Sequence, residues 1–186
     1  MPNWICNKLS ILDVDDDTRV EILKAIATRD ENGNPVIHTI DFNRIVPMPD
    51  DIYRGDLGSD EMKKYGDKNW YDWSIKHWGT KWNACDFIDN PQEYGADIIF
   101  NTAWDTPEPI FQTLWNMFPD AHFVVKYADE DIGCNCGIFD FKGETDFAQY
   151  TDKSTDSCAM EDAIRFACEV WDYDADDYLR EIQEEG

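Results

Sequence analysis

Two short strings of the sequence combine tryptophan with residues that could hold a ligand. The string WGTKW (residues 78–82) puts Lys81 beside two indoles, and TAWDTP (residues 102–107) adds another. A lysine can meet an anion while a tryptophan face stacks on a base, and such stacking is worth about 1–3 kcal/mol per base. One hypothesis is a pocket for a small nucleotide, lined by Trp78, Lys81, Trp82 and Trp104. The interpretation we favour is structural: Trp78 and Trp82 pack beneath or beside a sheet, and Gly79 permits a close turn.

Metal-binding residue types lack the spacing that a metal site requires. The six cysteines include one close pair, Cys134 and Cys136, whereas a zinc site commonly uses two short-spaced pairs. The acidic strings that begin at Asp13 and Asp172 lack the glycine and the glutamate that a calcium-binding loop carries at positions six and twelve. We therefore expect no metal and no other cofactor, and we expect the cysteines to be reduced.

The usual signatures of catalysis are also missing from the sequence. The histidines, His38, His77 and His122, lie in or beside β-like or aromatic stretches. No nucleophile elbow and no phosphate-binding glycine string occurs. Carboxylate pairs are too abundant to indicate a site. We therefore expect a non-catalytic protein, with a hydrolase of unrecognised type as an alternative.

Negative charge is the strongest feature of the composition. The chain has 40 acidic and 16 basic residues, a formal net charge of −24. Such a charge opposes binding to nucleic acid or to anionic membranes, because their phosphates repel it. It favours basic protein surfaces, including those that normally bind DNA or RNA. No apolar run approaches the ~18 residues of a membrane helix, and the N-terminus does not resemble a secretory signal, so we expect a cytoplasmic protein.

The acidic excess is greatest in the last third of the chain. From Asp129 onward there are 18 acidic and 4 basic residues. Within this region, residues 158–185 predict one helix, because apolar residues recur at steps of three and four. Side chains at that spacing lie ~5–6 Å apart, so a row of carboxylates could imitate the phosphates of a DNA strand. The candidate partner-binding residues are Asp162, Glu169, Asp172, Asp176 and Asp177.

Strands and helices are predicted to alternate in the first part of the chain. Residues 3–12 predict a strand with one register break, and residues 18–29 predict a helix. Residues 36–49 form a β-rich segment that two prolines end. Residues 50–69 predict a loop or an excursion, and the tryptophan-rich segment that follows, up to residue 87, is expected to be irregular or partly helical.

The alternation continues in the second part. Residues 96–104 predict a buried strand, followed by a helix with Thr106 as its N-cap and Pro107 as its first residue. Residues 122–129 predict another strand, and residues 133–144 a turn and a further strand. This order predicts an α+β fold, in which an antiparallel sheet carries helices on one face.

Five strings of the sequence occur in an order that resembles a known family. They are MPNWICNKLSI, FNRIVPMP, WGTKWNA, FNTAWDTPEPI and FPDAHFVVKYADED. Together they resemble the YubB-type ferredoxin-like family, which phages, plasmids and other bacterial mobile elements encode. The resemblance implies a βαββαβ-related core and no established reaction. This sequence differs after Tyr127, where ADEDIGCNCG replaces the glycine-rich turn of the family.

The resemblance and the composition together predict two regions. Residues 1–141 are expected to form a ferredoxin-like α+β domain with an aromatic-rich insertion around residues 50–90. Residues 142–186 are expected to form a polar linker and an acidic C-terminal helix that packs on this domain and lies outside the resemblance.

The functional hypothesis follows from the charge and the resemblance. We expect a non-catalytic accessory protein of a phage or mobile element that binds and inhibits a basic host protein, such as a nucleic-acid-binding defence enzyme, in the bacterial cytoplasm. The acidic surface would imitate nucleic acid. The first alternative is a protein that binds or sequesters a nucleotide signal through the Trp/Lys pocket, and the second is the hydrolase.

Overall fold

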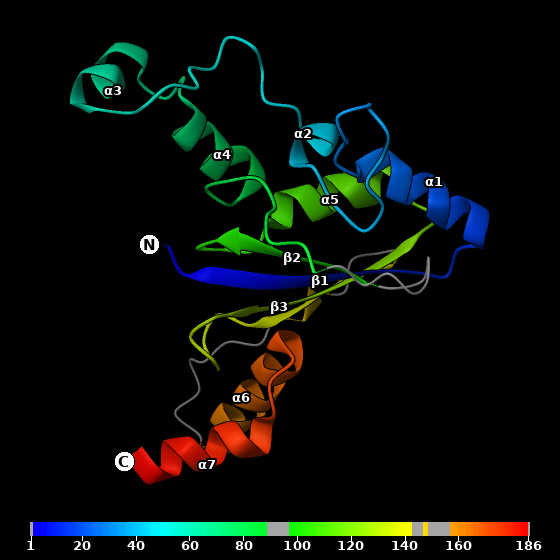
Figure 1. The fold of residues 1–186 in the computed structure, drawn as a ribbon, viewed down its shortest axis with the longest axis vertical. Helices are drawn as coiled ribbons and strands as arrows, with labels where there is room; N and C mark the ends of the chain where they lie inside the picture. The colour runs from blue at the N-terminus through cyan, green and yellow to red at the C-terminus, as the bar shows by residue number, and fades with distance from the viewer. Residues whose placement is uncertain (1, 89–96, 143–146, 149–156, 186) are drawn as a thin grey trace.

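A five-stranded antiparallel sheet forms the centre of the computed structural model (Figure 1). The structure describes residues 2–88, 97–142, 147–148 and 157–185. The strand order is β2-β1-β3-β4-β5, and each neighbouring pair is antiparallel. The strands are β1 (Trp4–Leu12), β2 (Ile98–Ala103), β3 (His122–Asp129), β4 (Gly137–Phe141) and β5 (Phe147–Ala148).

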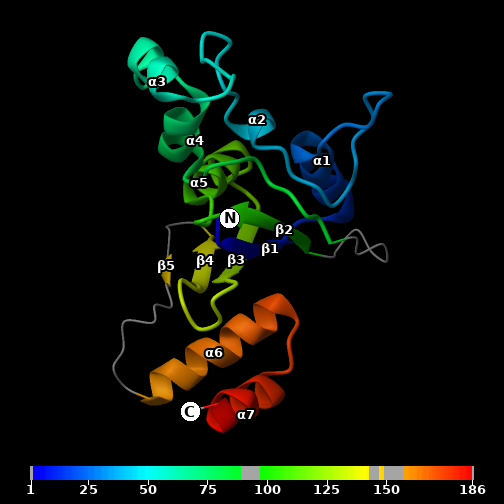
Figure 2. The same ribbon diagram turned by 60° about the vertical axis from the view of Figure 1, so that its left-hand side comes forward.

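Helices lie on both sides of this sheet (Figures 1 and 2). On one side are α1 (Asp16–Ile26), α2 (Phe42–Ile45), α3 (Ser59–Tyr65), α4 (Trp70–Trp78) and α5 (Glu108–Met117). On the other side are α6 (Ser157–Trp171) and α7 (Ala175–Glu185). The predicted α+β fold with an antiparallel sheet is confirmed. Among the described residues, no helix has the length and apolar character to cross a membrane.

The strand β1, which lies between β2 and β3, is buried from both sides. Ile5 and Leu9 are fully buried in the main core, under the helices of the first side. Cys6 points the other way, into a smaller cluster with Ala167 and Val170 of α6. Pairing with β2 and β3 runs without interruption, so the predicted register break is wrong. The irregular hydrophobic pattern arises because both faces of the strand are covered by apolar groups.

The predicted β-rich segment at residues 36–49 is also wrong. It is a loop that leads into the short helix α2, which Asp41 caps by accepting the Asn43 N–H. Ile40 and Phe42 are fully buried, so the apolar residues of this segment fill the core without belonging to the sheet. Along the chain, the described elements therefore follow the order β1-α1-α2-α3-α4-β2-α5-β3-β4-β5-α6-α7, which differs from the expected βαββαβ order.

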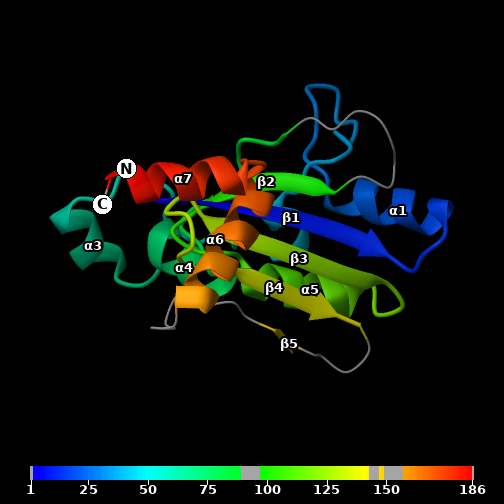
Figure 3. The same ribbon diagram turned by 90° about the horizontal axis from the view of Figure 1, so that it is seen from below.

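The single C-terminal helix predicted at residues 158–185 is two helices. Asp172 has a φ of 61°, in the left-handed region, which ends α6. Asp174 then caps α7, because its Oδ1 accepts the backbone N–H groups of Asp176 and Asp177 at 3.0 Å each. The prediction missed this break because the apolar spacing continues through it. Viewed from below, α6 lies across the strands, and α7 lies beside it on the outside (Figure 3). We call residues 157–185 the acidic hairpin.

Candidate functional site

The two tryptophan-containing strings meet where α4 ends and α5 begins. Gly79, the C-cap of α4, has a φ of 80°. A Cβ atom at this position would lie 2.8 Å from Cδ of Pro109. The next residue, Thr80, is fully buried, and its hydroxyl donates to the carbonyl oxygen of Ala103 at 2.7 Å. These two contacts tie residues 78–82 to the turn between β2 and α5, and the predicted close turn at Gly79 is confirmed.

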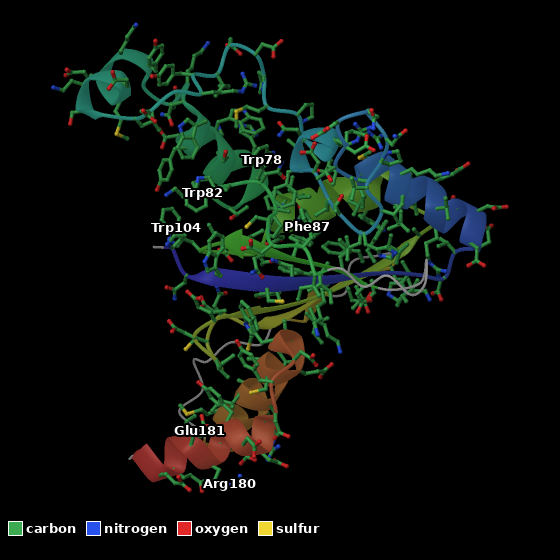
Figure 4. The ribbon with its side chains drawn as sticks, viewed as in Figure 1. Trp78, Trp82, Phe87, Trp104, Arg180 and Glu181 are labelled. Atoms are coloured by element: carbon green, nitrogen blue, oxygen red, sulfur yellow. The ribbon has the colours of Figure 1, made fainter. Side chains whose placement is uncertain are left out.

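Lys81, the next residue, lies over aromatic rings. Its ammonium nitrogen is 4.2 Å from the ring centroid of Trp82, 4.7 Å from that of Trp104 and 6.0 Å from that of Tyr71. A cation within about 6 Å of an aromatic face is attracted by the ring quadrupole. We call these four residues the aromatic cluster. Figure 4 shows Trp82 and Trp104 near the start of β1, where the indole of Trp4 lies 6.1 Å from that of Trp82.

Trp104 is held in an unfavourable backbone conformation. Its φ is 73°, and the left-handed region costs a residue with a Cβ atom roughly 1–2 kcal/mol. Its N–H donates to the carbonyl oxygen of Asn3 at 2.9 Å, which joins this turn to the segment before β1. The side chain nevertheless stays 41% exposed, so the strained backbone presents an indole to solvent.

A buried hydrogen-bond network supports this turn. The Thr106 hydroxyl donates to Oδ1 of Asn7 at 2.7 Å, and Nδ2 of Asn7 donates to the Thr102 hydroxyl at 2.9 Å. The Thr102 hydroxyl donates to the carbonyl oxygen of Asp105 at 2.8 Å. The predicted N-cap role of Thr106 is wrong, because its hydroxyl serves this network and α5 begins at Glu108 with Pro107 as its N-cap residue. The network fixes the path of the chain on either side of Trp104.

The surroundings of the cluster are acidic. Burial raises the pKa of Asp105, the residue after Trp104, and the nearby carboxylates of Glu108 and Asp129 raise it further. Burial also raises the pKa of Asp129. Glu130 accepts the backbone N–H of Trp4 at 3.2 Å. A cleft of about 260 Å³ adjoins this region, lined by Gly79, Asp105, Thr106, Glu108, Pro109, Tyr127 and Phe139. The local field therefore favours a cation over an anion.

The four residues of the predicted nucleotide pocket do not share one surface. Lys81, Trp82 and Trp104 come together, but Trp78 is only 4% exposed and belongs to the main core. Its indole N–H donates to the carbonyl oxygen of Val46 at 2.9 Å, and its ring meets that of Phe42 edge-on. Trp78 thus has the structural role that we favoured, whereas Trp82 remains 37% exposed.

The five predicted partner-binding acids do not form one helical row. Asp162 and Glu169 belong to α6, Asp172 to the turn, and Asp176 and Asp177 to α7. Ion pairs join Glu169 to Lys126 at 2.6 Å, Asp176 to Arg165 at 2.8 Å and Asp177 to Arg180 at 2.9 Å. The expected geometry of a continuous row is therefore corrected to two short groups of carboxylates on either side of a turn.

Both arginines of the acidic hairpin are neutralised within it. Arg165 pairs with Glu161 and Asp176, and Arg180 pairs with Asp177. In contrast, several exposed acids of the hairpin have no ion-pair partner among the described residues: Asp162, Asp172, Glu181 and Glu184. Figure 4 shows Arg180 and Glu181 on α7, far from the aromatic cluster. The hairpin thus presents unpaired negative charge to solvent.

The cysteines do not form a metal site in the described part of the chain, which contains no suitable group of three or more His, Cys, Asp or Glu side chains. Burial raises the pKa of Cys6 to about 11, so its thiol is protonated at neutral pH. Burial likewise raises the pKa of Cys85 to about 11. Cys6 packs as a small apolar side chain between β1 and α6.

Neither Tyr71 nor the network around Asn7 was predicted from the sequence. Tyr71 lies on α4, and only the tertiary arrangement brings it within reach of Lys81. Asn7 did leave a signal, since an asparagine at the centre of a strand needs buried partners when that strand is covered on both faces. The partners themselves, Thr102 and Thr106, lie about a hundred positions away in the chain.

The antiparallel sheet with its helices defines an α+β protein. A family described as the ferredoxin-like domain in Api92-like protein matches residues 77–174. This match covers more than half of the 186 residues, so the chain belongs to this family. The matched region contains both tryptophan strings and also α6, which we had placed outside the resemblance. No curated protein and no solved structure matches the chain.

Proposed function

We propose that this chain is a non-catalytic protein that binds and inhibits a basic host protein through its acidic hairpin. The proposal includes an origin in a phage or another mobile element. It also includes a nucleic-acid-binding defence enzyme as the target, because such an enzyme has a cationic surface that normally receives phosphates.

One observation carries the proposal: the hairpin uses both of its arginines internally and leaves carboxylates unpaired. A single exposed ion pair contributes about 0–1 kcal/mol, so no one acid would account for binding. Many like charges on one surface act together, because their summed field steers an oppositely charged partner during its approach. We therefore expect an affinity that falls steeply as the salt concentration rises.

The two-helix geometry changes how nucleic acid would be imitated. Asp162 and Glu169 would follow one short stretch of phosphates, and Asp176 and Asp177 another. Because Glu169 already pairs with Lys126, a partner would have to compete for this carboxylate. A cationic surface could instead meet the unpaired acids Asp162, Asp172, Glu181 and Glu184 without displacing an ion pair.

Nucleotide capture is the less favoured function on geometric grounds. A phosphate could meet Lys81, but it would also approach Asp105 and Glu108, which lie beside the cluster. A thermal-shift screen with nucleotides tests this alternative, because a ligand that binds only the folded state raises the melting temperature. Turnover of a panel of substrates tests the hydrolase alternative.

The central experiment compares two variants with equal changes of charge. The hairpin variant carries Asp162→Asn, Asp172→Asn, Glu181→Gln and Glu184→Gln. The control variant carries Asp17→Asn, Glu21→Gln, Glu31→Gln and Asp60→Asn, all exposed positions on the other side of the sheet. Each protein is used to capture partners from bacterial lysate, which mass spectrometry identifies, and the purified partner is then titrated between about 50 and 200 mM salt.

We expect the wild type and the control to recover the same basic protein, to lose affinity for it as salt rises and to inhibit it in competition with duplex DNA. The hairpin variant should recover little of it. Equal recovery by the hairpin variant would refute the role of the hairpin. An equal loss in both variants would show that only the net charge matters.

A further inference from the structure

The aromatic cluster holds a cation that has no acidic partner. The chain contains 40 acidic residues, yet within its described part no carboxylate lies at ion-pair distance from Lys81. Its ammonium group instead lies over the rings of Trp82 and Trp104, with Tyr71 at its side. The rings, rather than an opposite charge, therefore hold this lysine in place.

The rings come from three separate segments that the fold holds rigidly. Tyr71 lies in α4, Trp82 follows the Gly79 turn, and Trp104 lies in the turn that the Asn7 network supports. The rings of Tyr71 and Trp104 meet edge-on, with centroids 6.2 Å apart. Trp82 and Trp104 remain more than a third exposed. Strained residues such as Trp104 persist where the surrounding structure over-determines them, and they concentrate at functional sites.

We propose that Tyr71, Trp82 and Trp104 form a binding site for the positively charged side chain of a partner protein, and that Lys81 occupies this site in the free protein. Lysine has a long, flexible stem, so Lys81 can leave the rings while the backbone stays fixed by Gly79 and Thr80. A lysine or arginine of the partner then takes its place over the same faces.

The charge around the cluster decides between a cationic and an anionic occupant. Asp105 follows Trp104 directly, and Glu130 contacts the backbone of Trp4. These carboxylates attract a cation and repel a phosphate. Once Lys81 swings away, no other cation in the described part of the chain lies over these rings, so the vacated site favours a positive group more strongly than before.

This inference shares a basic partner with the proposed function but rests on a different surface. The cluster lies on the side of the sheet that bears α4, whereas the hairpin lies on the other (Figures 1 and 4). A test with small cations changes no acidic residue of the hairpin, and the capture experiment changes no residue of the cluster. Either proposal can therefore fail while the other stands.

The experiment titrates tetramethylammonium chloride and arginine amide into the whole protein, with sodium chloride at equal ionic strength as the reference. The indole N–H signals are followed by NMR and assigned with Trp82→Leu and Trp104→Leu. We expect saturable shifts of these two indole signals. In Lys81→Met, which keeps an unbranched apolar side chain without the charge, we expect binding to tighten about two- to fivefold, because the internal competitor is gone.

The control variant is Tyr173→Leu, which removes an exposed aromatic side chain at the hairpin turn and should leave the affinity unchanged. Trp82→Leu and Trp104→Leu should each abolish the saturable binding of the cations, while each variant protein still unfolds cooperatively on heating. The absence of saturable shifts in both the wild type and Lys81→Met would overturn the proposal. Tighter binding of adenosine monophosphate than of either cation, lost in Lys81→Met, would also overturn it and support nucleotide capture.

Discussion

The contact between Gly79 and Pro109 provides a quantitative test of how the two tryptophan strings are joined. Replacing Gly79 by alanine has two costs. An alanine at a φ of 80° occupies the left-handed region, at a cost of roughly 1–2 kcal/mol. Its Cβ atom would also lie 2.8 Å from Cδ of Pro109, a rigid ring atom at the start of α5. Such overpacking costs typically about 1–3 kcal/mol, so the total destabilisation is about 2–5 kcal/mol.

Gly33 provides a matched control. Its φ of 82° is nearly that of Gly79, but a Cβ atom there would have no neighbour within 4 Å. Gly33→Ala therefore carries the backbone cost of roughly 1–2 kcal/mol alone. Both substitutions restrict the unfolded chain to the same extent, so this effect cancels in the comparison. The difference between the two variants, about 1–3 kcal/mol, isolates the close approach to Pro109.

Urea unfolding, followed by tryptophan fluorescence, measures the free energy of unfolding of both variants, and thermal unfolding gives their melting temperatures. In a chain of this size each kcal/mol lowers the melting temperature by about 2–4 °C, so Gly79→Ala should melt about 2–12 °C below Gly33→Ala. Gly79→Ala should also alter the fluorescence of the folded state, because the displaced turn carries Lys81 and Trp82. Equal losses of stability in the two variants would refute the close packing of the α4 end against α5.

Three further substitutions probe the region around Trp104 and the hairpin. Thr106→Val removes the hydroxyl that donates to Asn7. It should lower the free energy of unfolding in urea by about 1–3 kcal/mol, because Oδ1 of Asn7 is left buried without a partner. A loss below ~0.5 kcal/mol would contradict the network. Asp105→Asn should stabilise the protein at neutral pH, because burial raises the folded-state pKa of this carboxyl and makes its ionised form unfavourable. The folded state binds a proton at Asp105 more tightly than the unfolded state does. The stability gained by Asp105→Asn should therefore shrink as the pH falls through the folded-state pKa and vanish below the ordinary aspartate pKa. A gain in stability that does not depend on pH would exclude the burial of this carboxyl as its cause. Asp174→Ala removes the cap of α7 and should cost about 1 kcal/mol, seen as faster amide exchange in residues 175–185 than in β1, and unchanged exchange would show that the cap does not stabilise α7.

Local patterns predicted the elements that carry their own signals. The strand at residues 122–129 was predicted with its observed bounds, because bulky apolar residues recur along it. The helix at residues 18–29 was recognised from its apolar spacing, with only its ends misplaced. Gly79 was identified as a close turn from its place between two tryptophans. In each case the residues that decide the structure are neighbours in the chain.

The errors occurred where a distant contact overrode the local pattern. Residues 36–49 are as apolar as a strand, but Phe42 and Ile45 fill a space beneath the helices of the main core instead of joining the sheet. Thr106 has a side chain that is typical of a helix N-cap, yet its hydroxyl donates to Oδ1 of Asn7 instead. The apolar spacing of the last segment continues through Asp172, although Asp174 starts a second helix there.

The sequence by itself determined the α+β class, the negative charge and the two strings that contain Lys81, Trp82 and Trp104 of the candidate site. Only the tertiary structure decided that Trp78 is buried while Trp82 and Trp104 remain exposed around Lys81, and that the acids divide between two helices. The physical reason is that a side chain's type is set locally, whereas its exposure and its partners depend on which distant segments pack against it. Lys81 is within reach of Trp104 because the Gly79 and Thr80 contacts join two turns that lie more than twenty residues apart in the chain.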